Sequence, residues 1–261
     1  MWVEKLARFG YAAKGIVYAI VGVLAVQAAF GTGGKTTDTK GALGAIASQP
    51  FGKFLLALVT FGLIGYVVWL LVQTIKDPEH KGNDAKGLAR RLGYGITCLT
   101  YASLALSAIR LLMGSGGGAS SSSSAQDWTA RLLSQPFGQW LVGIGGAFII
   151  GLGFYELYKA YKAKFRKQMK LHEMTSTEET WATRIGRFGL AARGVVFAII
   201  GFFLIQAARH SNPNEAQGLD GALQSLAQQP HGPWLLGIVA LGLVAYGIHM
   251  GVQARYRRIV A

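Results

Sequence analysis

The chain has 261 residues, of which 51% are hydrophobic and only 15% are charged, and its mean hydropathy is positive. This composition excludes an ordinary soluble domain, in which about 25% of the residues are charged. The formal net charge of +14 would suit a nucleic-acid-binding protein. The basic residues gather between long apolar runs, however, so we predict an all-α membrane protein that binds no nucleic acid.

Six apolar segments have the length, about 20 residues, that a helix needs to cross a bilayer. Because backbone groups in lipid must be paired within their own segment, we predict that all six are membrane-spanning α-helices. In chain order they cover residues 10–30, 54–73, 93–113, 140–158, 189–208 and 234–252.

Two sequence signatures occur three times, once in each third of the chain. The first opens a span and reads RFGYAAKG at 8–15, RLGYGITC at 91–98 and RFGLAARG at 187–194. The second lies just before the next span and reads SQPFG at 48–52, SQPFG at 134–138 and QQPHG at 228–232. The chain is therefore predicted to hold three tandem two-helix repeats. We place them at 1–80, 81–170 and 171–261.

Each repeat crosses the membrane twice, so every copy enters it in the same sense. This arrangement predicts pseudo-threefold symmetry about the membrane normal. Eighteen of the 26 Lys and Arg residues lie in the terminal segments and in the loops on the same side, against five in the loops of the other side. The positive-inside rule then predicts that both termini are cytoplasmic.

The connecting segments carry weaker signals. Short segments with helical apolar spacing precede the second signature, and we predict interfacial helices at 41–47, 128–133 and 221–227. The Gly/Ser-rich loop 114–126 is predicted to be a flexible tether on the outer face. The basic stretch 159–170 is predicted to attract anionic lipids of the bilayer on the cytoplasmic face.

The chain contains no HExxH, no CxxC and no nucleophile elbow, and its single cysteine is Cys98. We therefore predict no catalytic residues, no metal and no cofactor, and we expect a protein that is not an enzyme. Charged residues within the spans give a stronger signal, since they are costly in lipid unless paired or hydrated.

An intramembrane polar cluster is predicted on the cytoplasmic side, formed by Lys14, Thr97, Glu156, Arg193 and His249. Under a structural interpretation, Glu156 pairs with one or both cations while the long basic side chains reach the headgroups. Under a functional interpretation, the same residues line an inward-facing vestibule for an anion, a proton or a small polar solute.

A second candidate site lies near the outer ends of three helices. Gln27, Arg110 and Gln206 occupy matching positions in the three repeats. A ring of these side chains could bind an anion at an outer mouth. An arginine that reaches outward to the headgroups explains the position of Arg110 equally well.

The openings at Arg8 and Arg187 and the Gln-Pro-Phe-Gly turns at Gln49 and Gln135 resemble a bacterial integral membrane family known as domain of unknown function 1206. The third turn departs from the pattern with His231 in place of the phenylalanine, and the middle opening with Thr97 in place of the basic residue. The resemblance implies six helices in three tandem units in the bacterial cytoplasmic membrane, and it implies no activity.

Two functions fit these patterns. The first is a non-enzymatic module that packs against itself or other membrane proteins, and we favour it because small residues such as Gly247 and Gly251 recur on helix faces. The alternative is a transporter or channel for a small solute, an ion or protons, with a cytoplasmic-side polar vestibule.

Overall fold

The computed structural model describes residues 2–75, 85–114 and 121–259, and over these ranges the chain is helical with no strand. Six helices are long and apolar enough to cross a membrane. They are α1 (Trp2–Ala29), α3 (Gly52–Ile75), α4 (Ala85–Leu112), α6 (Gly138–Tyr161), α7 (Ser176–His210) and α9 (Gly232–Tyr256).

Two of these helices begin well before the apolar segments that predicted them. The helix α1 begins at Trp2 and α7 at Ser176, whereas the apolar runs begin near residues 10 and 189. A capping box explains the early start of α7, since Thr175 accepts a hydrogen bond from the Glu178 backbone while the Glu178 side chain accepts one from Thr175. Hydropathy alone detects the apolar part of such a helix and misses its polar first turns.

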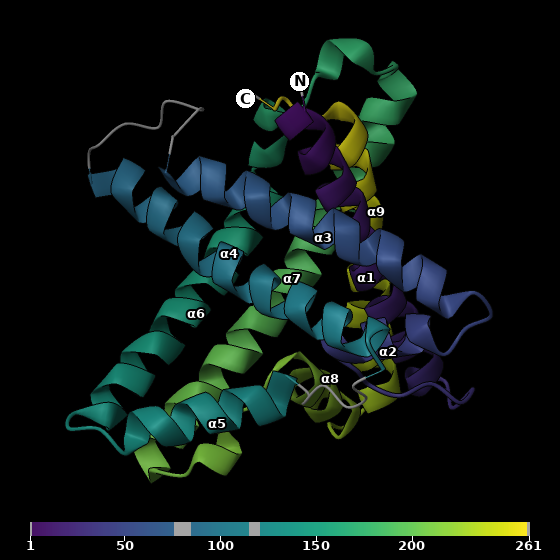
Figure 1. Cartoon of the computed structure of the whole chain (residues 1–261). Helices are drawn as coiled ribbons and strands as arrows, with labels where there is room; N and C mark the ends of the chain where they lie inside the picture. The colour runs from purple at the N-terminus through teal and green to yellow at the C-terminus, as the bar shows by residue number, and fades with distance from the viewer. Residues whose placement is uncertain (1, 76–84, 115–120, 260–261) are drawn as a thin grey trace.

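Three shorter helices precede α3, α6 and α9, and they lie at the end of the molecule opposite the termini (Figure 1). They are α2 (Thr39–Ala47), α5 (Ser121–Leu133) and α8 (Leu219–Ala227). The predicted tether 114–126 is wrong from Ser121 onward, because that part belongs to α5, and residues 115–120 lie outside the described ranges. Asp220 of α8 accepts hydrogen bonds from the backbone and hydroxyl of Ser122 and so fixes the start of α5.

The second signature forms the turn between a short helix and the next long one. Phe51, Phe137 and His231 have φ values of 58°, 63° and 63°, in the left-handed region. At the following glycines a Cβ would lie within 2.4 Å of a backbone oxygen of the preceding helix. The glycine of the signature is therefore required by a close backbone contact.

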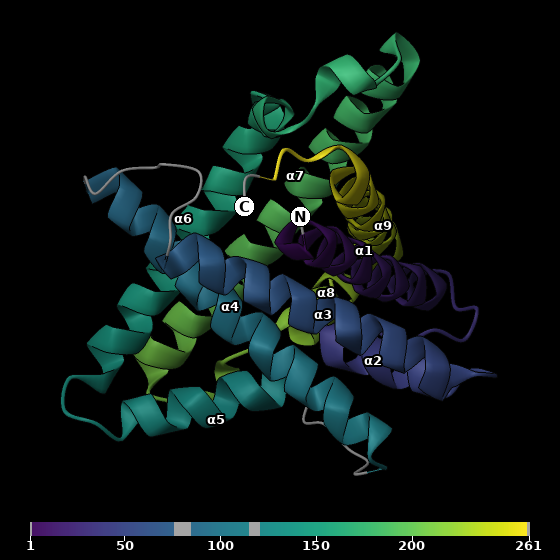
Figure 2. The same cartoon turned by 45° about the horizontal axis from the view of Figure 1, so that its top comes forward.

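The six long helices pack in an array with the order α4, α3, α1, α9, α7, α6. Figure 2 shows α1 beside α9, so the first and last long helices of the chain are neighbours in the middle of the array. The two end members, α4 and α6, belong to the same predicted repeat but do not pack against each other along their described lengths. We call this interruption of the array the α4/α6 seam.

Glycines allow the closest helix contacts within the array. A Cβ at Gly247 of α9 would lie 2.6 Å from the carbonyl oxygen of Gly15 in α1. A Cβ at Gly194 of α7 would lie 2.8 Å from the carbonyl oxygen of Gly153 in α6. The matched glycines of the first and third repeats therefore make the same kind of contact, each with the last long helix of another repeat.

Candidate functional site

A buried lysine lies at the centre of the array. Lys14 of α1 is only 4% exposed, and its Nζ donates a hydrogen bond of 3.3 Å to the hydroxyl of Tyr66 in α3. The same nitrogen lies 5.1, 5.0 and 5.6 Å from the ring centroids of Tyr66, Tyr101 and Tyr246. Three helices, α3, α4 and α9, thus supply an aromatic cage for one cation, and cation–π contacts are strongest where water is absent.

Glycine makes this cage possible. A Cβ at Gly10, one turn before Lys14 on α1, would lie 2.6 Å from the Cβ of Tyr66. The missing side chain lets α3 approach α1 closely enough for the tyrosine to reach the lysine.

An ion-pair cluster lies next to the cage. Arg193 of α7 donates a hydrogen bond of 3.4 Å to Glu156 of α6, and Lys159 donates to both carboxylate oxygens of Glu156 at 3.0 and 3.1 Å. The Glu156 and Arg193 side chains are 11% and 16% exposed, and that of Lys159 is 26% exposed. The pair expected between Glu156 and Arg193 is therefore present, with Lys159 as an additional partner.

Tyr246 connects the two groups. Its ring centroid lies 5.6 Å from Lys14 Nζ and 5.0 Å from Arg193 Cζ. The cage and the ion pairs therefore form one cluster, to which all six long helices contribute a side chain. We call it the central cluster: Lys14, Tyr66, Tyr101, Glu156, Lys159, Arg193 and Tyr246.

The central cluster has more positive than negative charge. Lys14, Lys159 and Arg193 are its cations and Glu156 is its single carboxylate. Glu156 forms ion pairs with Lys159 and Arg193. Among the described residues, no carboxylate lies within ion-pair distance of Lys14, whose Nζ donates its hydrogen bond to Tyr66. Rings and one hydroxyl stabilise the charge of Lys14 only in part, so the centre is electrostatically suited to an anion.

His249 of α9 belongs to a separate group of buried residues. It is fully buried, its Nε2 lies 2.8 Å from the Gln253 amide, and its ring centroid is 4.7 Å from that of Phe165. Its Nδ1 has no hydrogen-bond partner among the described residues. Here the imidazole fills space between α9 and the segment that follows α6.

Three comparisons with known proteins bear on identity. The model described as Domain of Unknown Function (DUF1206) matches residues 9–77, 92–163 and 188–257. The chain belongs to the DUF1206 family. "Uncharacterized protein YxxB" of Bacillus subtilis (strain 168) is 40% identical over 258 residues, which cover 99% of this chain and 92% of that protein. No solved structure matches the chain.

Each DUF1206 segment supplies part of the central cluster. The first holds Lys14 and Tyr66, the second Tyr101 and Glu156, and the third Arg193 and Tyr246. Each matched segment also lies within one predicted repeat, although the outer bounds of the repeats stay a prediction.

The remaining predicted site residues are not brought together. The hydroxyl of Thr97 donates to the carbonyl of Gly93 in its own helix. Gln27 and Arg110 are exposed and Gln206 is half-buried, and no hydrogen bond joins them within the described ranges. Within the same ranges, no three His, Cys, Asp or Glu side chains form a group that could hold a metal ion.

The sequence reasoning missed the tyrosines of the cage, although a signal for them exists. Four residues after the matched positions Lys14, Thr97 and Arg193 stands an aromatic residue in each repeat: Tyr18, Tyr101 and Phe197. One turn of helix places such an aromatic residue on the face of the basic one. Tyr66 and Tyr246 likewise occupy matching positions in the first and third repeats.

Proposed function

We propose that this DUF1206 protein is a six-span protein of the bacterial cytoplasmic membrane with both termini in the cytoplasm. The length and composition of the six long helices support the membrane placement, and the excess of Lys and Arg on the side of the termini supports the orientation. The matched glycine contacts of α1 with α9 and of α7 with α6 support an approximate threefold relation of the repeats.

We further propose that the protein transports a small anion and is not an enzyme. The observation that carries the proposal is the central cluster, where three cations face one carboxylate among helices that cross the bilayer. Charges at such a depth are costly and are a common mark of ion and solute pathways. An anion that reaches Lys14 would compensate the charge that no carboxylate of the cluster neutralises.

The α4/α6 seam offers a route for the conformational change that transport needs. The helices on its two sides both reach the central cluster, since Tyr101 comes from α4 and Glu156 from α6. These two helices do not pack on each other, so they can separate without the loss of a packed interface. Movement of α4 away from Lys14 would open the cage on one side.

The packing module remains a second candidate, and the closed aromatic cage favours it. One observation counts against it, however: most of the glycines at matching positions pack inside the molecule. Gly247 packs on α1, as do Gly15 and Gly22 on α9. These three glycines are therefore not available to a partner protein, and of the Gly247/Gly251 pair only Gly251 is exposed.

Flux measurements test the transport proposal. Purified protein in liposomes is expected to pass at least one of chloride, nitrate, phosphate and a short carboxylate. We expect Lys14→Met to lower the flux by about tenfold or more, since a hydrogen bond to a charged group contributes about 1.5–3 kcal/mol. Lys53→Gln serves as the matched control, because Lys53 is an exposed cation at the start of α3.

Either of two results would overturn the transport proposal. Wild-type protein without flux for the whole panel, or a loss of flux in Lys53→Gln equal to that in Lys14→Met, would leave the packing module as the better account. Reporter fusions at the two termini test the orientation separately, and a reporter active only outside the cytoplasm contradicts it.

A further inference from the structure

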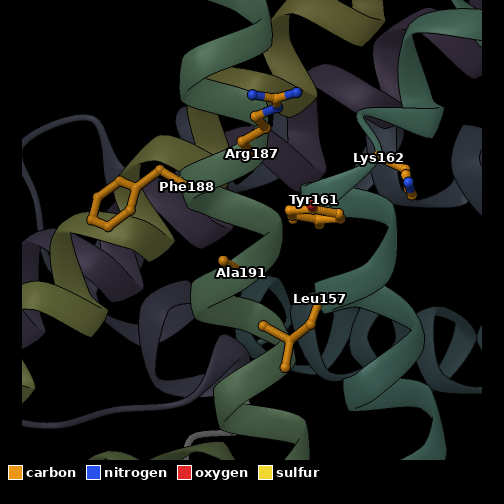
Figure 3. Close-up of a pocket in the computed structure, with 7 residues that line it drawn as sticks. Leu157, Tyr161, Lys162, Arg187, Phe188 and Ala191 are labelled. Carbon is orange, nitrogen blue, oxygen red and sulfur yellow. The ribbon is translucent and has the colours of Figure 1, made fainter.

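A groove runs between the C-terminal end of α6 and the facing turns of α7. Its volume is about 700 Å³, within the range of about 300–1,000 Å³ that is typical of small-ligand sites. Figure 3 shows the side chains that line it: Leu157, Ala160 and Tyr161 from α6, Lys162 directly after α6, and Arg187, Phe188 and Ala191 from α7.

The groove has a polar end and an apolar end. Arg187 and Lys162 lie at the end near the last turn of α6, and Leu157 and Ala191 lie further along the helices (Figure 3). Within the described ranges neither cation has an ion pair or a hydrogen bond to another side chain, and Lys162 lies over the ring of Tyr161 at 5.3 Å. Two exposed cations at the polar end of the groove are thus free to bind an anion.

We propose that this groove binds one anionic phospholipid, with the phosphate between Lys162 and Arg187 and the first methylenes of an acyl chain along Leu157 and Ala191. The proposal rests on the proposed placement in the bilayer and is independent of the proposed transport. The helix α6 ends at Tyr161, so the two cations lie where a spanning helix leaves the hydrocarbon layer.

The order of charged and apolar side chains along the groove supports a lipid over other occupants. A phospholipid places its phosphate at the interface and its methylenes toward the bilayer centre, as the cations and the apolar side chains are placed here. Tyr161 is 75% exposed at the same level, and tyrosine is enriched where headgroups meet hydrocarbon. The guanidinium of Arg187 can bind a phosphate through two parallel hydrogen bonds.

Native mass spectrometry of the full chain in a neutral detergent tests the site. The wild type is titrated with phosphatidylglycerol and, separately, with phosphatidylcholine. We expect one saturable phosphatidylglycerol molecule per chain, and a loss of affinity of about tenfold or more in Lys162→Gln/Arg187→Gln, since each cation near an anionic lipid contributes about 1 kcal/mol.

Lys5→Gln/Lys167→Gln is the matched control. Both lysines are exposed, both lie near the same end of the molecule, and the pair removes the same charge without touching the groove. Little change in this control supports a local site, whereas an equal loss in both double variants shows diffuse surface attraction and overturns the proposal. Equal binding of phosphatidylcholine overturns it as well.

Two further measurements separate the sources of a phosphate group and the shape of the site. Displacement of the lipid by inorganic phosphate at the same concentration would show a site for free phosphate and would contradict a lipid site. Ala191→Phe fills the apolar end without a change of charge, and we expect it to weaken phosphatidylglycerol binding. Undiminished binding in that variant would place the lipid elsewhere. Recovery of the wild type in the membrane fraction of cells tests the bilayer placement on its own.

Discussion

A single methyl group at Gly247 should separate α9 from α1. A Cβ there would lie 2.6 Å from the carbonyl oxygen of Gly15, and 2.7 and 2.9 Å from the backbone nitrogen and the Cβ of Ala19. These contacts are mostly with backbone atoms, so no side chain can turn away and the two helices must move apart. Insertion of a methyl group into a packed interface typically costs about 1–3 kcal/mol.

Gly251 provides the control for this substitution. It lies one turn further along the same helix, and a Cβ there would meet nothing within 4 Å. Alanine at either position gains about 1 kcal/mol of helix propensity, so the difference between the two variants isolates the steric cost. We expect Gly247→Ala to be the less stable variant by about 1–3 kcal/mol.

Thermal unfolding in one detergent measures this difference. For a chain of this size, 1 kcal/mol corresponds to a shift in Tm of about 2–4 °C. We therefore expect Gly247→Ala to unfold about 5 °C below Gly251→Ala. Equal Tm values for the two variants, or a lower value for Gly251→Ala, would refute the assignment of Gly247 to the α1–α9 interface.

Three other predictions follow from single contacts, the last of them the hydrogen bond of 3.0 Å that Lys170 Nζ donates to Glu173. Glu156→Gln leaves Arg193 buried without its carboxylate, and we expect a loss of about 3–5 kcal/mol of stability in chemical unfolding; an unchanged midpoint would contradict the ion-pair cluster. Asp220→Ala removes the acceptor that fixes α5 to α8, and we expect a loss of about 1–3 kcal/mol, with faster limited proteolysis of α5 as a second measurement. The hydrogen bond from Lys170 lowers the pKa of Glu173 below its ordinary value. This pair therefore stabilises the fold fully at pH values above the ordinary carboxyl pKa, and the stabilisation is lost as pH falls through the lowered pKa of Glu173. We expect Lys170→Gln to raise the pKa of Glu173 in an NMR titration, and an unchanged pKa would show that the bond does not form.

The long helices could be predicted from sequence because their signal is local. About 20 apolar residues in a row define a spanning helix without reference to the rest of the chain. The repeats were also visible, since the signature of Arg8 returns at Arg187. The family match to three segments and the six long apolar helices confirm both features.

The order of the helices in space could not be predicted in this way. The two spans of the second predicted repeat, α4 and α6, do not pack against each other along their described lengths, and no pattern in the sequence indicates this. Whether a glycine lies in a close helix contact depends on the helix that packs against it, and a local sequence pattern does not identify that helix. Gly247 and Gly251 form one GxxxG pattern, yet only a Cβ at Gly247 would meet another helix.

The candidate site was predicted in part. Lys14, Glu156 and Arg193 could be found because charge is rare in apolar segments. The tyrosines were missed because an aromatic residue in a spanning helix is ordinary, and only the approach of Tyr66 and Tyr246 to a cation gives them a role. The ring of Gln27, Arg110 and Gln206 rested on matching positions alone, which fix a level along the helices and leave the direction of the side chains open.

The order α6, α7, α9, α1, α3, α4 has a consequence for how the chain is assembled. If the termini were joined and the chain were opened between α4 and α5, the long helices would follow one another along the new chain in their spatial order. In the natural order, the interface of α1 with α9 closes only after the last helix has been synthesised. The pair α6 and α7 is therefore joined to α1, α3 and α4 only once α9 has been made, and a chain that stops before α9 would lack the element that joins them.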